Sequence, residues 1–160
     1  MYQRIKSSRY FIALLAGSGA MLCITILGSF STLTPHSIWL MAPFGATMVI
    51  LFGLPQSPLA QPKNIILGHI LTTAIGLAIV SLIGVSPWSM GLAVGLAVSA
   101  MLLTNTTHPP AGANPLVVML AGESWSFLFM PVAVGSILIV IFGVLYHRMI
   151  SGEAYPQKIR

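Results

Sequence analysis

Charged side chains are scarce in this sequence. Aspartate and glutamate together occur only twice in 160 residues, and charged residues of both signs make up 6% of the chain, against 56% hydrophobic residues. A soluble domain carries about 25% charged residues, which it needs to cover a surface that faces water. We therefore expect an integral membrane protein, residues 1–160 forming a single domain whose main partner is the lipid bilayer.

Several kinds of chemistry lack the residues that they need. No acidic side chain lies within an apolar segment, although cation transporters and pumps generally place carboxylates there. The sequence has no Cys/His cluster with metal-binding spacing, no glycine-rich phosphate loop and no nucleophile–base pair. Its basic residues lie without interleaved aromatic residues, which argues against nucleic acid as a partner. We expect no enzyme activity, no metal and no cofactor.

The apolar segments predict an all-α fold with about six transmembrane segments. Residues 11–30, 65–85 and 127–146 are long enough to span a bilayer as helices, which takes about 20 residues. Residues 38–54 and 90–103 are apolar but shorter, and residues 116–121 are too short to span alone. The second and fifth segments are therefore expected to be broken or re-entrant. The one cysteine, Cys23, lies in the first segment and has no partner for a disulfide.

Basic residues set the expected orientation, because they are enriched in cytoplasmic loops. They lie at both ends of the chain and in one central loop: Arg4, Lys6, Arg9, Lys63, Arg148, Lys158 and Arg160. Both termini and the loop around Lys63 are thus predicted to be cytoplasmic, with Glu123 outside. An even number of crossings between Lys63 and Arg148 then requires that residues 104–121 also cross the membrane.

The sequence resembles itself at an offset of 67 residues. This offset places Pro43, Gly45 and Ala46 on Pro110, Gly112 and Ala113, and it aligns the glycine pairs 68/135 and 76/143. Repeat 1, about residues 11–85, and repeat 2, about residues 86–147, each hold three crossings, so the second must be inverted. Inverted repeats with broken helices that meet near the membrane midplane are a recurrent plan in transporters.

The longest polar interruption lies between two apolar runs, at residues 104–115. This segment and the one around Pro43 are typical helix starts, because proline is favoured in the first turn. A helix N-terminus carries about half a positive charge and free N–H donors, so two opposed starts would bind an anion without Lys or Arg. The alternative is that these residues only kink and pack helices. The predicted substrate-binding residues are Pro43, Gly45, Ala46, Thr47, Asn105, Thr106, Thr107, His108, Pro109, Pro110, Gly112, Ala113 and Asn114.

Histidine is the ionisable residue within this stretch. His108 precedes two prolines, which disfavour helical geometry before them, so an extended backbone is expected there. An ionisable group at membrane depth is a functional candidate, and histidine titrates near neutral pH. His108 could bind the anion, carry a co-transported proton, or only cap the helix that follows. His36 and His147 are expected to be solvated at the membrane edges, and His69 is interpreted as a packing residue near the inner mouth.

A face of small residues lies on the segment after residue 90. Gly91, Gly95 and Ser99 are spaced four residues apart, which lets helices approach closely. This face fits either a contact within the fold or a homodimer.

The central stretch resembles the signature of the HPP family of integral membrane proteins. The signature is Thr107-His108-Pro109-Pro110-Ala111-Gly112-Ala113-Asn114-Pro115, preceded by Ala42-Pro43-Phe44-Gly45-Ala46-Thr47, and the similarity extends to Tyr146. The resemblance implies a bacterial or plastid-type membrane protein, in a family with members linked to nitrite transport. Family descriptions usually give about four spans, fewer than the crossings counted above.

These observations favour a small-anion transporter or channel, with nitrite as the expected substrate, in a bacterial inner membrane. The anion would be held at opposed helix N-termini near the membrane midplane. The alternative, from another class, is a non-transporting membrane scaffold that assembles partner proteins.

Overall fold

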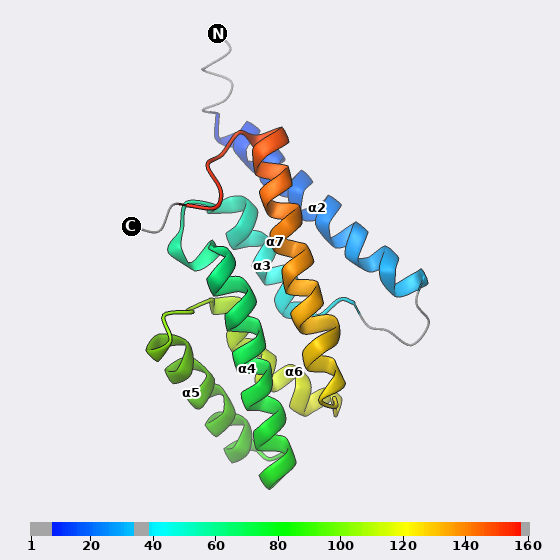
Figure 1. Ribbon diagram of the computed structural model, residues 1–160, viewed down its shortest axis with the longest axis vertical. Helices are drawn as coiled ribbons and strands as arrows, with labels where there is room; N and C mark the ends of the chain where they lie inside the picture. The colour runs from blue at the N-terminus through cyan, green and yellow to red at the C-terminus, as the bar shows by residue number, and fades with distance from the viewer. Residues whose placement is uncertain (1–7, 34–38, 158–160) are drawn as a thin grey trace.

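The computed structural model describes residues 8–33 and 39–157, and every regular element within these ranges is helical (Figure 1). His36 and the basic residues Arg4, Lys6, Lys158 and Arg160 lie outside the described residues. The α-helices are α2 (Arg9–Leu33), α3 (Ala42–Gly53), α4 (Pro62–Ile83), α5 (Pro87–Leu103), α6 (Asn114–Ala121) and α7 (Val134–Tyr146). The short ones are the 3-10 turns η1 (Pro58–Ala60) and η2 (Pro109–Ala113) and the π turns η3 (Leu128–Ala133) and η4 (His147–Ser151).

Three helical stretches are long and apolar enough to cross a membrane: Arg9–Thr32, Pro62–Ile83 and Leu128–Ser151. They correspond to the three long segments predicted from the sequence. By contrast, α3 has 12 residues and α6 has 8, which at 1.5 Å per residue gives about 18 Å and about 12 Å. Neither spans a hydrocarbon core of about 30 Å, and we call α3 and α6 the half-helices.

Proline and serine mark where these helices begin. A proline occupies one of the first two positions of α3, α4, α5, η2 and α6, where its missing N–H removes no helical hydrogen bond. Ser86 and Ser89 form a capping box at the start of α5, each hydroxyl accepting a hydrogen bond from the other's backbone N–H. Gly122 ends α6 in the left-handed conformation, with φ of 68°, which glycine adopts without steric cost.

The half-helices lie behind α4 and α7 in Figure 1 and run in opposite directions from the middle of the molecule. α3 ends at the same end of the molecule as α7, where His147 contacts the Leu51 carbonyl, while α6 runs toward the other end, along α4. α5 packs beside α4, and α2 contacts α3 and α7. The half-helix starts therefore come together near the centre.

Glycines on the long helices let the half-helices approach closely. A Cβ added at Gly76 of α4 would lie 2.6 Å from Cα of Pro115 and 2.7 Å from the Val118 side chain. The same addition at Gly143 of α7 would come within 2.9 Å of Leu51. These distances leave no room for a side chain. At Gly76 the near neighbour is the backbone of α6, whereas at Gly143 it is the end of the Leu51 side chain, which fills the space that the glycine leaves.

Two further glycines repeat this arrangement nearer the centre. A Cβ at Gly68 would lie 2.9 Å from Cβ of His108, and one at Gly135 would lie 2.7 Å from the Phe44 ring. The innermost side chains fill the space between these helices, and Phe44, Ile65, Val118 and Ile139 are fully buried.

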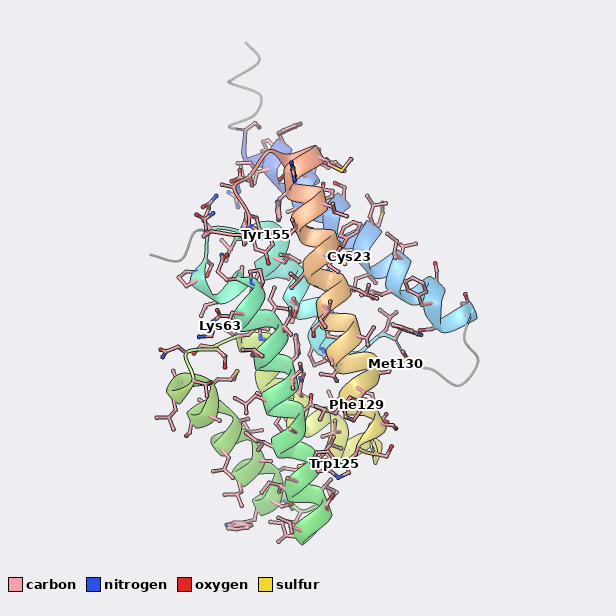
Figure 2. The ribbon with its side chains drawn as sticks, in the orientation of Figure 1. Cys23, Lys63, Trp125, Phe129, Met130 and Tyr155 are labelled. Atoms are coloured by element: carbon pink, nitrogen blue, oxygen red, sulfur yellow. The ribbon has the colours of Figure 1, made fainter. Side chains whose placement is uncertain are left out.

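The outer surface is largely apolar. Trp125, Phe129 and Met130 project outward around η3 (Figure 2), and Leu103 and Met149 are about four-fifths exposed, at 83% and 77%. Monomeric soluble proteins rarely expose so much apolar area, whereas a lipid-facing surface of a membrane protein requires it. This surface fits the membrane class predicted from the composition.

Replacing Gly76 with alanine is expected to destabilise the fold, because the new methyl group would collide with the backbone of α6. Overpacking of this kind costs about 1–3 kcal/mol, so the unfolding midpoint in detergent should fall. Gly17→Ala in α2 is the matched control, since Gly17 is exposed and nothing lies within 4 Å of its Cβ position; it should be neutral or slightly stabilising. Equal midpoints for the two variants would contradict the close α4–α6 contact.

Candidate functional site

Thr47 lies where α3, α4 and the segment before η2 meet. Its hydroxyl oxygen is 3.0 Å from Nε2 of His69 and 2.9 Å from Nε2 of His108, and 3.1 Å from the carbonyl oxygen of Pro43. All three side chains are fully buried, and the two imidazole centroids lie 5.0 Å apart. We call Thr47, His69 and His108 the His–Thr–His cluster.

The backbone before η2 fixes the position of His108. Its φ of −139° and ψ of 99° are extended, as expected for a residue that precedes proline. The extended backbone turns the ring inward, and its Nδ1 lies 2.8 Å from the Leu59 carbonyl oxygen of η1. Gly68 makes room for this arrangement, because a side chain there would collide with Cβ of His108.

Asn114 fixes the other end of the cluster from the first turn of α6. Its Nδ2 lies 3.0 Å from the His69 carbonyl oxygen, 2.9 Å from the Thr73 hydroxyl and 3.0 Å from Nδ1 of His69. Its Oδ1 lies 3.3 Å from the same Nδ1. Within the described residues, no buried side-chain nitrogen or oxygen lacks a hydrogen-bond partner, so this polar cluster is internally satisfied, as membrane depth demands.

The structure therefore brings together only part of the predicted site. Thr47, His108 and Asn114 are joined in one network. Asn105 is exposed with φ of 53°, and Thr106 bonds to Thr104, 2.7 Å between hydroxyl oxygens. The Thr107 carbonyl accepts a hydrogen bond from Asn64 at 2.9 Å. These residues shape the turn between α5 and η2 and do not join the cluster.

The remaining predicted residues lie on the outer side of the half-helices. A groove of about 590 Å³, here the half-helix groove, is lined by Ala42, Pro43, Ala46, Val49, Ile50, Pro109, Pro110, Ala113 and Val117. All of these side chains are apolar. Gly45 and Gly112 have nothing packed against them within 4 Å of their Cβ positions. Residues of the two helix starts thus line one groove.

Backbone donors at the two starts are partly engaged in tight turns. The Phe44 N–H donates to the Met41 carbonyl, and the Ala111 N–H donates to the His108 carbonyl, both at 2.9 Å. The η2 turn is a 3-10 helix, in which each N–H bonds three residues back. The groove lining has no basic residue, so the peptide dipoles at the two helix starts are the source of positive charge that remains there.

Two histidines differ from the sequence interpretation. His147 was expected to be solvated but is 1% exposed, because its Nε2 contacts the Leu51 carbonyl and its ring packs on Phe52 and Tyr155. His69 belongs to the cluster and was missed as a site residue. The available signal was the spacing of His69, Thr72 and Thr73 on the helix face that also carries Gly68 and Gly76.

A second cavity lies between the start of α2 and the ends of α3 and α7. It measures about 760 Å³, and its lining includes Phe11, Phe52, Tyr146, His147 and Glu153. Gln56 donates a hydrogen bond to Glu153 at 3.1 Å. This cavity lies at the opposite end of α3 from Pro43 and shares no residue with the groove.

Apolar spanning helices, half-helices and a sealed polar centre together define a multi-helix integral membrane protein. Residues 3–156 match the family model described as HPP, transmembrane region. The chain therefore belongs to the HPP family.

Two curated relatives are transmembrane proteins of Dictyostelium discoideum. One is 35% identical over 144 residues, which is 85% of this chain and 46% of the relative. The other is 35% identical over 125 residues, which is 73% of this chain and 44% of the relative. The chain thus spans less than half the length of these relatives. No solved structure matches it significantly.

Replacing Asn114 with leucine is expected to destabilise the protein, because Nδ1 of His69 and the Thr73 hydroxyl lose a buried partner. Such a loss costs about 1–3 kcal/mol. The control is Asn64→Leu, which removes one hydrogen bond at a half-buried position and should cost about 1 kcal/mol or less. Unfolding midpoints in detergent measure both. An Asn114→Leu midpoint at or above that of Asn64→Leu would contradict this role.

Proposed function

We propose that this HPP family protein moves a small inorganic anion, with nitrite as the favoured substrate, across a bacterial inner membrane. The observation that carries the proposal is the half-helix groove, where the starts of α3 and of η2–α6 flank one apolar space. Both helix starts, where the positive ends of the helix dipoles lie, border that space. Nitrite itself is inherited from the resemblance to the family.

The charge distribution supports an anion over a cation. The two acidic residues of the sequence, Glu123 and Glu153, lie outside the long helices, so no carboxylate faces the half-helix groove. Helix-end charge acts more strongly where water is excluded, and the groove lining is apolar. An anion without a tightly held hydration shell could enter such a space and gain the helix-end attraction.

The proposal includes two inverted repeats with six membrane segments and cytoplasmic termini. Support comes from the glycine contacts: Gly76 packs on Val118, and Gly143 packs on Leu51. The 67-residue offset places Gly76 on Gly143 and Leu51 on Val118, so each of the two contacts is the counterpart of the other. The same offset relates the pair Gly68–Ala111 to the pair Gly135–Phe44. Contacts exchanged in this way are expected of halves related by a two-fold axis in the membrane plane.

A homodimer is a further element of the proposal. Gly91, Gly95 and Ser99 are exposed on α5, and no atom lies within 4 Å of the Cβ position of either glycine. The small-residue face is therefore not used for packing within the described part of the chain, and it is free for a second copy.

Cysteine labelling tests the topology. With Cys23 replaced, a cysteine at position 123 should react with an impermeant maleimide from outside the cell. A cysteine at position 63 should react only after the inner face is exposed, because Lys63 marks the cytoplasmic side. Reaction of position 123 from the inside alone would rule out the six-segment topology.

Nitrite flux tests the function. Proteoliposomes with the protein should take up nitrite faster than protein-free liposomes, which also correct for permeation of nitrous acid. Ala113→Phe should lower uptake because the ring would fill the half-helix groove. Ala121→Phe, at an exposed site near the end of α6, is the control and should leave uptake unchanged. Uptake no faster than in protein-free liposomes would refute transport and leave the scaffold alternative.

A further inference from the structure

We propose that the His–Thr–His cluster is a binding site for one proton, which the two imidazole rings share through the Thr47 hydroxyl. The link between this proton and anion movement rests on the proposed function, whereas the proton site itself does not. The argument starts from hydrogen-bond accounting within the cluster, because each member has a limited set of donors and acceptors.

The Leu59 carbonyl fixes the direction of the chain of hydrogen bonds. A carbonyl oxygen only accepts, so Nδ1 of His108, 2.8 Å away, must carry a hydrogen. In the neutral ring Nε2 is then an acceptor, and the only donor facing it is the Thr47 hydroxyl at 2.9 Å. Thr47 has a single hydrogen and two acceptors, Nε2 of His108 and the Pro43 carbonyl at 3.1 Å. The Pro43 carbonyl, four residues back in α3, also faces a backbone N–H of the helix, whereas Nε2 of His108 faces no other donor among the described residues, so we assign the hydrogen to His108.

The other ring must then carry its hydrogen on the opposite nitrogen. With its hydrogen given to His108, the Thr47 oxygen can only accept from Nε2 of His69 at 3.0 Å. Nδ1 of the neutral His69 ring is consequently an acceptor, and the donor that faces it is Nδ2 of Asn114 at 3.0 Å. The two hydrogens of Nδ2 are shared among this nitrogen, the His69 carbonyl and the Thr73 hydroxyl. The four side chains form one directed chain from Asn114 through His69 and Thr47 to His108 and the Leu59 carbonyl.

Each ring also has the partner that its protonated form would need. If His108 binds a proton at Nε2, the Thr47 hydroxyl can turn and donate instead to the Pro43 carbonyl, 3.1 Å away. If His69 binds a proton at Nδ1, the Asn114 Oδ1 can accept it from 3.3 Å. Neither change requires a helix to move.

The chain also allows the proton to pass between the rings with all atoms accounted for. When a hydronium ion gives its proton to the cluster and leaves as water, the proton binds Nδ1 of His69. The Nε2 hydrogen of His69 then moves to the Thr47 oxygen, and the Thr47 hydrogen moves to Nε2 of His108. One N–H bond forms and one breaks on His69, one O–H bond forms and one breaks on Thr47, and one N–H bond forms on His108. The positive charge has then crossed from α4 to the segment before η2.

The surroundings limit the site to one proton. Two cationic rings with centroids 5.0 Å apart would repel strongly in a buried site. No other titratable group lies on α3, η1, η2, α5 or α6, and on α7 there is only Tyr146, at its far end. The nearest charge on α4 is Lys63, whose exposed amine contacts the Thr104 carbonyl at 3.5 Å. The two rings therefore titrate as a pair, with no carboxylate to hold a second proton.

Nitrogen-15 NMR of histidine-labelled protein in detergent tests the directed chain. The unprotonated and protonated ring nitrogens have distinct shifts, and His69→Gln and His108→Gln spectra assign the signals. Neutral His108 should carry its hydrogen on Nδ1 and neutral His69 on Nε2. If both rings carry it on the same nitrogen, the shared proton site is wrong.

Titration of Thr47 variants tests the sharing. In wild-type protein the signals of both rings should shift together as the first proton binds. Thr47→Val keeps the shape but lacks the hydroxyl, so only one ring should shift in that step, and Thr47→Ser should restore joint titration. Joint titration of the two rings in Thr47→Val would overturn the relay. Separate titration in the wild-type protein would overturn it as well, and this second measurement does not depend on the folding of any variant.

The same variants separate this inference from the proposed function. If NMR finds the two rings in opposite tautomers and the proteoliposomes show no nitrite flux, the proposed transport is refuted and the proton site stands. If nitrite is transported, Thr47→Val should change the pH profile of uptake, and Thr47→Ser should retain it. Identical pH profiles for wild type and Thr47→Val would refute the coupling of this proton to transport.

Discussion

The whole structure depends on one constraint: backbone and polar side chains at membrane depth must find their partners inside the protein. Half-helices bring such groups to the centre of the molecule, where the chain enters α3 and η2. The lack of a side chain at Gly68, Gly76, Gly135 and Gly143 lets these segments pack closely against α4 and α7. Without these close contacts, the turns at Pro43 and Pro110 would be exposed on both sides.

The same packing gives the centre two distinct sides. On the side facing α4, the His–Thr–His cluster and Asn114 satisfy one another with no charged partner. On the opposite side, the half-helix groove is apolar and flanked by two helix starts. A small anion and a proton would thus be held by different faces of the same segments, close enough for each to influence the other through the field at the helix starts.

Much of this arrangement could be predicted from the sequence. Proline positions gave the helix starts, since their effect on the first turn is local, and hydropathy gave the long helices, whose bounds differ by only a few residues at α4. The shared pattern around Pro43 and Pro110 pointed to two helix starts, and residues of both line one groove. These features could be predicted because a helix start depends on residues adjacent in sequence and a spanning helix depends on the apolar length that a membrane requires.

The misses have a common physical origin. Burial of His147 depends on the tail folding back so that the Tyr155 hydroxyl bonds to the Ala60 carbonyl, a contact between residues far apart in sequence. The role of His69 depends on which face of α4 meets Thr47. The division of the predicted site between an inner cluster and an outer groove depends on how α3 and η2 are rotated, and helical rotation is decided by packing.

The central claim is that an anion is held in the half-helix groove between the two helix starts. Crystals grown with bromide, whose anomalous scattering locates it among light atoms, test this most directly. The account predicts an anomalous peak beside Pro43 and Pro110 that disappears when nitrite is added in excess. Lipid acyl density filling the groove, or a bromide peak there that nitrite does not displace, would contradict it.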